Sequence, residues 1–275
     1  MSLFELPPPN VTSDPAARER LGQGYLALRQ WLGRIGLALP IALVVFRIWD
    51  GGETELRTSI SAYYYSAMRD VFVGALIAIG LFLITYRGNT WWEWLIATIS
   101  GVGAIGVALL PTARQCKEAD KTVFFAEHCG LYKHNGTETA QPDYFFWQDT
   151  ADYQVSSGFF SVSTLHFASA AVFLLGVAAL AYWAFVITSD TGVSDPDEKT
   201  RRNVFYRRCA IIIVGCIAAI GFDSLMNWLE VWNSDPLKPV FWLECFAVWA
   251  FAAAWLQKGE NESLNWAASK LKRKT

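Results

Sequence analysis

The stretch TSISAYYYSAMRDVFVG, residues 58–74, places three consecutive tyrosines and an Arg-Asp pair directly before an apolar run that continues to Tyr86. Aromatic and charged side chains favour the interface between lipid and water, whereas an unbroken apolar run favours the hydrocarbon. The stretch therefore predicts an interfacial rim that leads into a membrane-spanning helix.

The composition of the chain also indicates an integral membrane protein. Hydrophobic residues make up 53% of the 275 residues and charged residues 17%, whereas soluble proteins contain about 25% charged residues. Several apolar runs approach or exceed the length of about 20 residues that a helix needs to cross a bilayer. The formal net charge of -2 does not point to a partner. We expect the lipid bilayer and a bound lipid as partners, and no nucleic acid or nucleotide.

The apolar runs predict an all-α fold, a bundle of six transmembrane helices. The amphipathic pattern of residues 16–32 predicts a separate interfacial helix, which with the N-terminal tail forms a first unit, residues 1–30. The transmembrane domain covers residues 31–257, and a basic tail, residues 258–275, follows it. The six spans are predicted at residues 31–49, 71–86, 92–110, within 158–187, 209–232 and 240–256.

The placement of Lys and Arg predicts the orientation of the chain. With both termini in the cytoplasm, the cytoplasmic segments hold 15 of the 23 basic residues, five of them in the connector 188–208. Cytoplasmic loops of membrane proteins carry an excess of Lys and Arg. We therefore expect both ends in the cytoplasm, in a bacterial inner membrane.

The one long loop, residues 113–157, carries Cys116 and Cys129 on the side predicted to be extracytoplasmic. Disulfides form in oxidising compartments, so a Cys116–Cys129 bridge that closes the loop is the preferred interpretation. The alternative adds His128 and His134 to form a Cys₂His₂ zinc site, but the spacing matches no standard zinc finger. Cys209, Cys216 and Cys245 fall within predicted spans, where cysteine serves as a small packing residue.

The segment GVGAIG, residues 101–106, has the spacing of a dinucleotide-binding glycine motif. It lies inside a predicted span rather than between a strand and a helix, so the structural context of that motif is missing. Small residues at this spacing allow helices to approach closely. We interpret the segment as a helix-packing surface.

Polar residues inside the predicted spans share one depth. At 1.5 Å per residue, His166 and Asp223 lie about 12 Å and about 13 Å below the same surface. Asn227 and Glu230 follow Asp223 on one helix face, and Glu244 lies one turn into the sixth span. Ionisable groups at such depth face a bundle interior or a wet cavity, and the opposite halves of the spans carry nothing comparable. The candidate polar cavity comprises Arg47, Ser61, Tyr63, Tyr64, Tyr65, Arg69, Asp70, His166, Asp223, Asn227, Glu230 and Glu244.

Several functions are compatible with this polar ring. A self-satisfied network that only orients the helices would have the same sequence pattern. A metal-dependent hydrolase acting on lipid amides or esters would use His166, Asp223 and Glu244 as zinc ligands, although the chain contains three histidines in total and only one in a span. A transporter would predict an inverted repeat, and the two halves do not resemble each other. A subunit of a larger assembly, or a homo-oligomer, would leave an apolar surface at the aromatic outer loop.

Four segments carry a resemblance to a known group of proteins: SISAYYYSAMRDVFVGALIAIGLFLITYRG (59–88), LHFASAAVFLL (165–175), RRNVFYRRC (201–209) and FWLECFAVWAFAAAWLQKG (241–259). In these segments the chain resembles an uncharacterised group of bacterial six-span membrane proteins. It is similar in layout to the Frag/DRAM/Sfk-type proteins, which are linked with lipid and membrane homeostasis. The resemblance implies a six-span fold and assigns no activity.

The preferred functional hypothesis is therefore non-enzymatic. It is binding of a lipid or a small polar ligand in an outward-facing cavity, without a cofactor, in a homeostatic or regulatory role. Zinc enters only with the hydrolase alternative.

Overall fold

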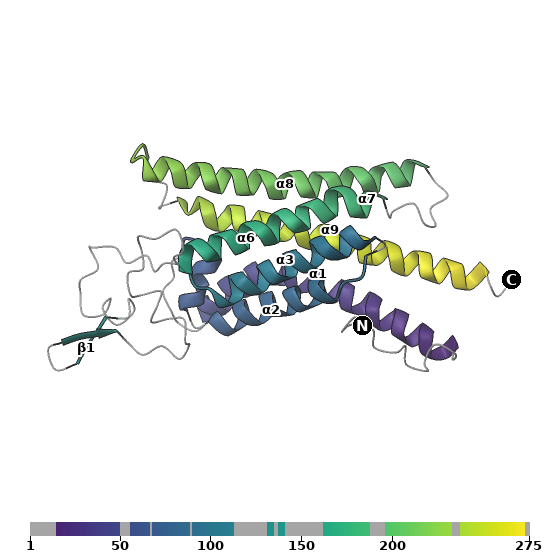
Figure 1. The fold of residues 1–275 in the computed structure, drawn as a ribbon, viewed down its shortest axis with the longest axis horizontal. Helices are drawn as coiled ribbons and strands as arrows, with labels where there is room; N and C mark the ends of the chain where they lie inside the picture. The colour runs from purple at the N-terminus through teal and green to yellow at the C-terminus, as the bar shows by residue number, and fades with distance from the viewer. Residues whose placement is uncertain are drawn as a thin grey trace, which may run out of the picture.

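Long helices dominate the part of the chain that the computed structural model describes, which is residues 15–49, 56–66, 68–88, 90–112, 131–134, 137–140, 162–187, 196–232 and 237–272 (Figure 1). In chain order the helices are α1 (Pro15–Trp49), the 3₁₀ helix η2 (Ser61–Tyr65), α2 (Arg69–Thr85), α3 (Trp91–Leu109), α6 (Val162–Ala179), the π-helical turn η4 (Leu180–Ala184), α7 (Phe185–Ile187), α8 (Pro196–Trp228) and α9 (Pro239–Lys272).

One short antiparallel strand pair accompanies the helices. Strand β1 (Leu131–His134) pairs with β2 (Thr137–Ala140), with Leu131 opposite Ala140. The pair belongs to the long loop predicted at residues 113–157. Cys116, Cys129 and His128 of that loop lie outside the described residues, and so do its aromatic residues at 124, 125 and 144–147.

The six long helices form a closed ring. Helix α1 packs against α2, α2 against α3, α3 against α6, α6 against α8, and α8 against α9, which returns to α1. The α6–α8 and α1–α2 joints are the least extensive of the six. Along its length the ring holds a continuous apolar core, in which the buried ring of Trp255 contacts Phe82, Tyr86, Phe185 and Phe251.

Five helices of the described chain are long and apolar enough to cross a membrane. They are Arg20–Val45, Trp91–Leu109, Thr164–Ala184, Pro196–Trp228 and Pro239–Glu260. These helices support the prediction of an integral membrane protein with several spans. The second predicted span corresponds to α2, whose 17 residues correspond to about 26 Å of helix, so it is shorter than the others.

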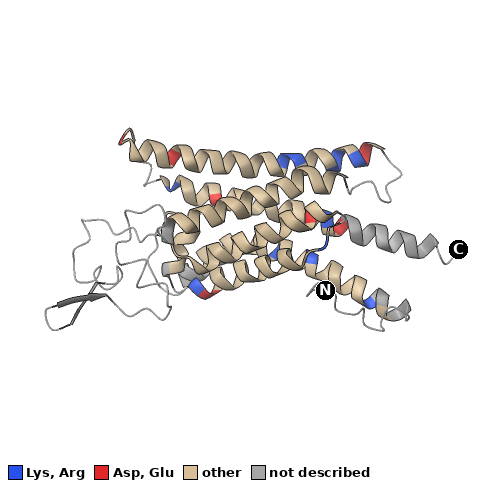
Figure 2. Ribbon diagram, in the orientation of Figure 1, with Lys and Arg blue, Asp and Glu red and all other residues tan. Residues whose placement is uncertain are grey.

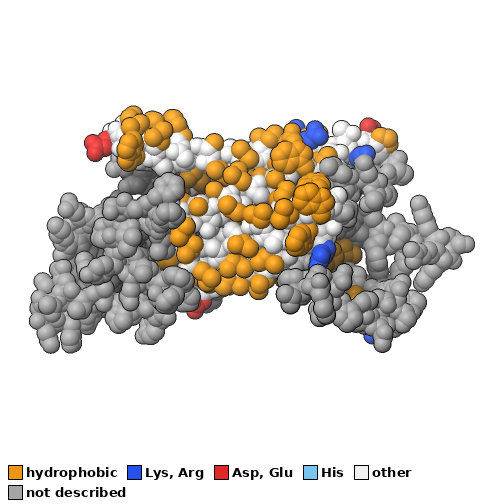
Figure 3. Space-filling view, viewed as in Figure 1, with side chains coloured by type: hydrophobic (Ala, Val, Ile, Leu, Met, Phe, Trp, Pro, Cys, Tyr) orange, Lys and Arg blue, Asp and Glu red, His pale blue; other side chains and the backbone are white. Residues whose placement is uncertain are grey.

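The surface of the bundle agrees with a hydrocarbon environment. Large apolar side chains such as Ile211 (63% exposed) and Val102 (60% exposed) point outward from the middle of their helices. Hydrophobic side chains are spread over the central part of the visible face (Figure 3). Most of the described charged residues lie toward the two ends of the bundle (Figure 2). This distribution is the one that a lipid bilayer selects.

The first helix crosses the boundary predicted at residue 30. Helix α1 runs without interruption from Pro15 to Trp49. The predicted amphipathic segment and the first predicted span therefore belong to one helix, and Arg29 lies where they join. In the structure Arg29 is 1% exposed, and its guanidinium lies 5.2–5.6 Å from the ring centres of Tyr86, Phe185 and Trp255.

Buried polar residues also lie at the end of the bundle opposite the predicted cavity. Arg29, Glu93, Arg202 and Lys258 are all less than 9% exposed. Arg29 and Lys258 share the ring of Phe185, at 5.6 and 5.7 Å. Arg29, Arg202 and Lys258 lie outside the predicted spans, because α1, α8 and α9 continue as helix beyond the apolar segments that define those spans.

The glycine motif of α3 is a packing surface, as predicted. A Cβ atom on Gly101 would lie 2.9 Å from the backbone nitrogen of Ile84 in α2. One on Gly103 would lie 2.8 Å from the carbonyl oxygen of Ser169 in α6. Helix α3 therefore approaches both of its neighbours through glycine.

Candidate functional site

The segment between α1 and α2 forms one wall of the site. Ser59 begins the turn, because its hydroxyl accepts a hydrogen bond from the amide of Ala62 at 3.0 Å. The following 3₁₀ helix η2 buries the rings of Tyr63 and Tyr64, and Tyr63 packs on Phe241 of α9 with ring centres 6.2 Å apart. Two of the three consecutive tyrosines therefore anchor this segment in the core. The side chain of Tyr65 lies outside the described residues.

The start of α9 holds this wall through two charged side chains. Glu244 Oε2 accepts a hydrogen bond from the backbone amide of Ile60 at 2.5 Å, and the same carboxylate accepts one from the amide of Ser61. It thus satisfies amides at the start of η2, as a capping residue does at a helix N-terminus. Lys238 donates a hydrogen bond to the carbonyl oxygen of Leu56. Glu244 of α9 and Lys238, the residue before α9, therefore both position residues 56–61.

His166 connects the same wall to α3 and α6. Its Nδ1 lies 2.6 Å from the carbonyl oxygen of Leu110 and its Nε2 lies 3.0 Å from Ser61 Oγ. A carbonyl oxygen can only accept, so the proton is on Nδ1. His166 is 2% exposed and lies behind Ser61 as seen from the cavity described next. Its two hydrogen bonds join the end of α3, the first residue of η2 and α6.

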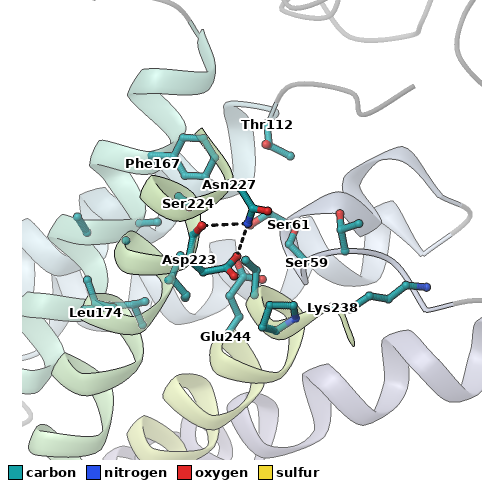
Figure 4. A pocket seen from close by; sticks show the side chains of 18 of the residues that line it. Ser59, Ser61, Thr112, Phe167, Leu174, Asp223, Ser224, Asn227, Lys238 and Glu244 are labelled. Carbon is teal, nitrogen blue, oxygen red and sulfur yellow. Dashed lines mark hydrogen bonds between the residues drawn. The ribbon is translucent and has the colours of Figure 1, made fainter. Parts of the chain in front are cut away.

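A cavity of about 1050 Å³ lies between α6, α8, α9 and the wall segment (Figure 4). Its volume is at the upper end of the usual range for small-molecule sites, which is about 300–1,000 Å³. The lining divides into two kinds of residue. Hydroxyl, amide and charged side chains include Thr58, Ser59, Ser61, Thr112, Asp223, Ser224, Asn227, Glu230, Lys238 and Glu244. Apolar residues include Phe167, Ala170, Ala171, Leu174, Ile217, Ile220, Trp232, Pro239 and Val240.

Helix α8 contributes a polar stripe to this cavity. The amide nitrogen of Asn227 donates to both the backbone oxygen and Oδ2 of Asp223, at 2.9 and 3.1 Å (Figure 4). Asp223 is 8% exposed, whereas Glu230 lies past the end of the helix, is exposed and has a φ of 56°. The predicted helical spacing brings Asp223 and Asn227 to the cavity wall, whereas Glu230 lines the cavity from beyond the end of α8.

The remaining predicted site residues lie elsewhere. Tyr64 is in the core, and Arg69 lies over its ring at 4.5 Å and donates to its hydroxyl at 2.9 Å. Asp70 is exposed at the start of α2. The side chain of Arg47 lies outside the described residues. The structure thus brings together at the cavity Ser61, Asp223, Asn227, Glu230 and Glu244, with His166 behind Ser61.

The three residues of the zinc alternative do not form a ligand set. Among the described residues, no three His, Cys, Asp or Glu side chains are placed to share a metal ion. Both nitrogens of His166 face Leu110 and Ser61, and Glu244 faces backbone amides. The geometry therefore gives the zinc alternative no support.

Several residues of the cavity are missed by sequence reasoning. Four of them carry hydroxyl groups, which are too common in sequences to indicate a site. They are Thr58, Ser59, Thr112 and Ser224, and they lie near predicted site residues or predicted helix ends. Lys238 follows the short turn before α9, where its charge resembles an ordinary loop residue. Contacts between helices, which the sequence does not encode locally, bring these residues to one site.

Comparison of the chain with protein-family models, with curated proteins and with solved structures gave no match.

Proposed function

We propose that this protein is a six-span membrane protein that binds a lipid, or another amphiphile, in the cavity between α6 and α8. The observation that carries the proposal is the division of the cavity lining into a polar part and an apolar part. An amphiphile has the same division, and it has access to a cavity at a helix joint from the surrounding bilayer. The role that follows is in membrane homeostasis or regulation.

Helix α2 serves as the sixth span in this proposal. It lies in the ring between α1 and α3, and its length of about 26 Å is close to the hydrocarbon thickness of about 30 Å. Arg69 and Asp70 begin it and Arg87 follows it, so charges mark both of its ends. Six crossings place both termini on one side, which the Lys and Arg distribution assigns to the cytoplasm of a bacterial inner membrane.

A disulfide between Cys116 and Cys129 closes the outer loop in this proposal. Alkylation of the unfolded protein tests it, with the buried thiols of Cys209, Cys216 and Cys245 as internal controls. These three label before and after reduction, whereas Cys116 and Cys129 label only after it. Labelling of all five without reductant would remove the disulfide from the account.

One contact resembles part of a hydrolytic active site. Ser61 Oγ and His166 Nε2 are 3.0 Å apart at the cavity wall, which is the separation of an activated nucleophile and its base. Acyl transfer also needs donors aimed at the developing oxyanion. The backbone amides of Ile60 and of Ser61 itself are occupied by the carboxylate of Glu244. We therefore favour binding, with the Ser61–His166 contact as a structural support.

The test is the lipid content of protein purified in a mild detergent. Native mass spectrometry of the wild type is expected to detect about one tightly held lipid per chain. Ala171→Phe, which places a ring in the cavity, is expected to remove it. Ala168→Phe is the matched control, because Ala168 is exposed on the same helix and does not line the cavity. Wild-type protein that stays lipid-free after incubation with a bacterial polar lipid extract would overturn the proposal.

A further inference from the structure

The charged side chains around the cavity indicate which headgroup charge the bound amphiphile carries. Three carboxylates, those of Asp223, Glu230 and Glu244, line it against one basic side chain, Lys238. We infer that the ligand carries a cationic ammonium headgroup, an inference that rests on the proposed lipid-binding function. The ligand class is that of amine-headed amphiphiles, in which a primary or quaternary ammonium is joined to acyl chains.

Asp223 is the residue on which the inference depends. It is 8% exposed, and its side chain lies at the cavity wall (Figure 4). Its hydrogen-bond partner is the uncharged amide of Asn227, one turn along the same helix. Among the described residues, no Lys or Arg side chain pairs with it. A buried carboxylate without a positive partner is costly, and an ammonium group in the cavity supplies that partner.

The other two carboxylates and the lysine define where the cation is held. Glu244 is committed to the amides of Ile60 and Ser61. The ammonium of Lys238 donates to the carbonyl of Leu56, so it is held at the wall segment. Glu230 is exposed near the mouth and adds a negative field there. The attraction for a cation is therefore strongest beside Asp223.

Aromatic and hydroxyl groups complete the headgroup site. Phe167 (59% exposed) and Trp232 (44% exposed) both line the cavity. Aromatic faces attract ammonium groups, and the attraction includes quaternary ammonium. Hydroxyl side chains from Thr58, Ser59 and Ser224 can donate to the ester or phosphate oxygens that follow the ammonium in an aminophospholipid.

The acyl chain has a path along the same pair of helices. Ala170, Leu174 and Ile217 form part of the apolar lining of the cavity. A second groove of about 520 Å³ lies farther along α6 and α8, and its lining consists of Leu175, Ala178, Ala179, Tyr182, Trp183, Ala210, Ile211, Val214 and Gly215. Leu175 and Ala178 of the groove follow Ala171 and Leu174 of the cavity at i+4, so the two spaces lie one turn apart on the same face of α6. A hydrocarbon chain that leaves the headgroup site meets an apolar surface toward the other end of the bundle.

The test compares two lysolipids of equal chain length in the detergent-purified protein. Binding of lysophosphatidylethanolamine and lysophosphatidylglycerol is titrated by native mass spectrometry. The wild type is expected to bind the ethanolamine lipid about tenfold more tightly, since one buried charge interaction of this kind corresponds to about a factor of ten. Asp223→Asn is expected to remove this preference. Asp70→Asn, the same substitution at an exposed carboxylate outside the cavity, is expected to keep it.

The outcomes separate this inference from the proposed function. Equal binding of both lysolipids by the wild type, or tighter binding of the glycerol lipid, overturns the ammonium headgroup and leaves lipid binding intact. Absence of binding of either lipid overturns both. If Asp223→Asn does not fold, the affinities of the wild type for the two lysolipids still decide whether the headgroup is cationic. Glu230→Gln, at an exposed position, then serves as the second variant, with an expected two- to threefold loss of preference.

Discussion

Glu244 shows how one side chain can organise the rim of a helical bundle. Its carboxylate accepts the amides of Ile60 and Ser61, and Ser61 in turn contacts His166, which holds the end of α3. Four parts of the chain that are far apart in sequence are joined by this series of contacts. The wall of the cavity therefore depends on Glu244 for its position.

Truncation of Glu244 tests this dependence. Glu244→Ala leaves two backbone donors without their acceptor, and we expect the free energy of unfolding to fall by roughly 2–4 kcal/mol. Glu244→Gln keeps one acceptor oxygen and is expected to lose less than half as much. Unfolding followed by circular dichroism in detergent measures both. Equal stability of the alanine variant and the wild type would contradict the role of Glu244 as a cap.

The burial of Arg29 leads to a second prediction, on the stability of the protein. Because its guanidinium lies among three aromatic rings and is buried, Arg29→Ala is expected to cost roughly 2–4 kcal/mol of unfolding free energy. Arg34→Ala is the control on the same helix, since Arg34 is exposed and lies over one ring, that of Trp31. The control is expected to stay within about 0.5 kcal/mol of the wild type. Similar losses in the two variants would show that the burial of Arg29 is unimportant.

Single residues also show which parts of the site can be predicted from the sequence. The helical spacing of Asp223, Asn227 and Glu230 predicts a shared face, because spacing along one helix is a local property. The burial of Arg29 is not predictable in this way. It depends on Tyr86, which follows α2, on Phe185 of α7 and on Trp255 of α9.

At the scale of elements, the close approach of α3 to its neighbours fixes the order of the ring. Gly101 contacts α2 and Gly103 contacts α6, so opposite sides of one glycine motif serve two interfaces. The packing function is readable from the sequence, because small residues at this spacing have few other uses inside a span. The neighbours that they contact are not readable.

Substitution of a glycine in α3 tests this interface. In Gly103→Ala the new Cβ would lie 2.8 Å from backbone atoms of Ser169 and Phe173, and backbone cannot move aside easily. We expect a loss of roughly 1–3 kcal/mol of unfolding free energy from overpacking. Gly74→Ala in α2 is the matched control, because a Cβ there meets nothing within 4 Å. The control is expected to be neutral or to stabilise the helix by up to about 1 kcal/mol. A neutral Gly103→Ala would contradict close packing at this position.

Helix lengths are the part of the fold that the sequence predicts least well. Helix α8 begins at Pro196, whereas the apolar pattern predicts a span from residue 209. Hydropathy detects the segment that suits hydrocarbon, and a charged helical extension beyond it has no such signature. The buried Arg202 and Lys258 lie in such regions, which explains why they are absent from the predicted site.

For the whole molecule, the ring of six helices implies an even number of membrane crossings if α2 spans the bilayer. Reporter domains fused after residue 88, within residues 188–195 and after residue 275 are then expected on the same side, and a fusion within residues 141–150 on the other side. Protease protection in sealed vesicles measures the location of each. A reporter after residue 88 on the side of residues 141–150 would show that α2 does not cross.

The central claim of the account is that a lipid is held at the α6–α8 joint. The most direct measurement is photo-cross-linking with lysophosphatidylethanolamine that carries a diazirine in its acyl chain, followed by mass spectrometry of the labelled peptides. The account predicts labelling concentrated in residues 162–187 and 196–232, reduced by excess unlabelled lipid and by Ala171→Phe but not by Ala168→Phe. Labelling spread evenly over all six helices, and unaffected by Ala171→Phe, would contradict it.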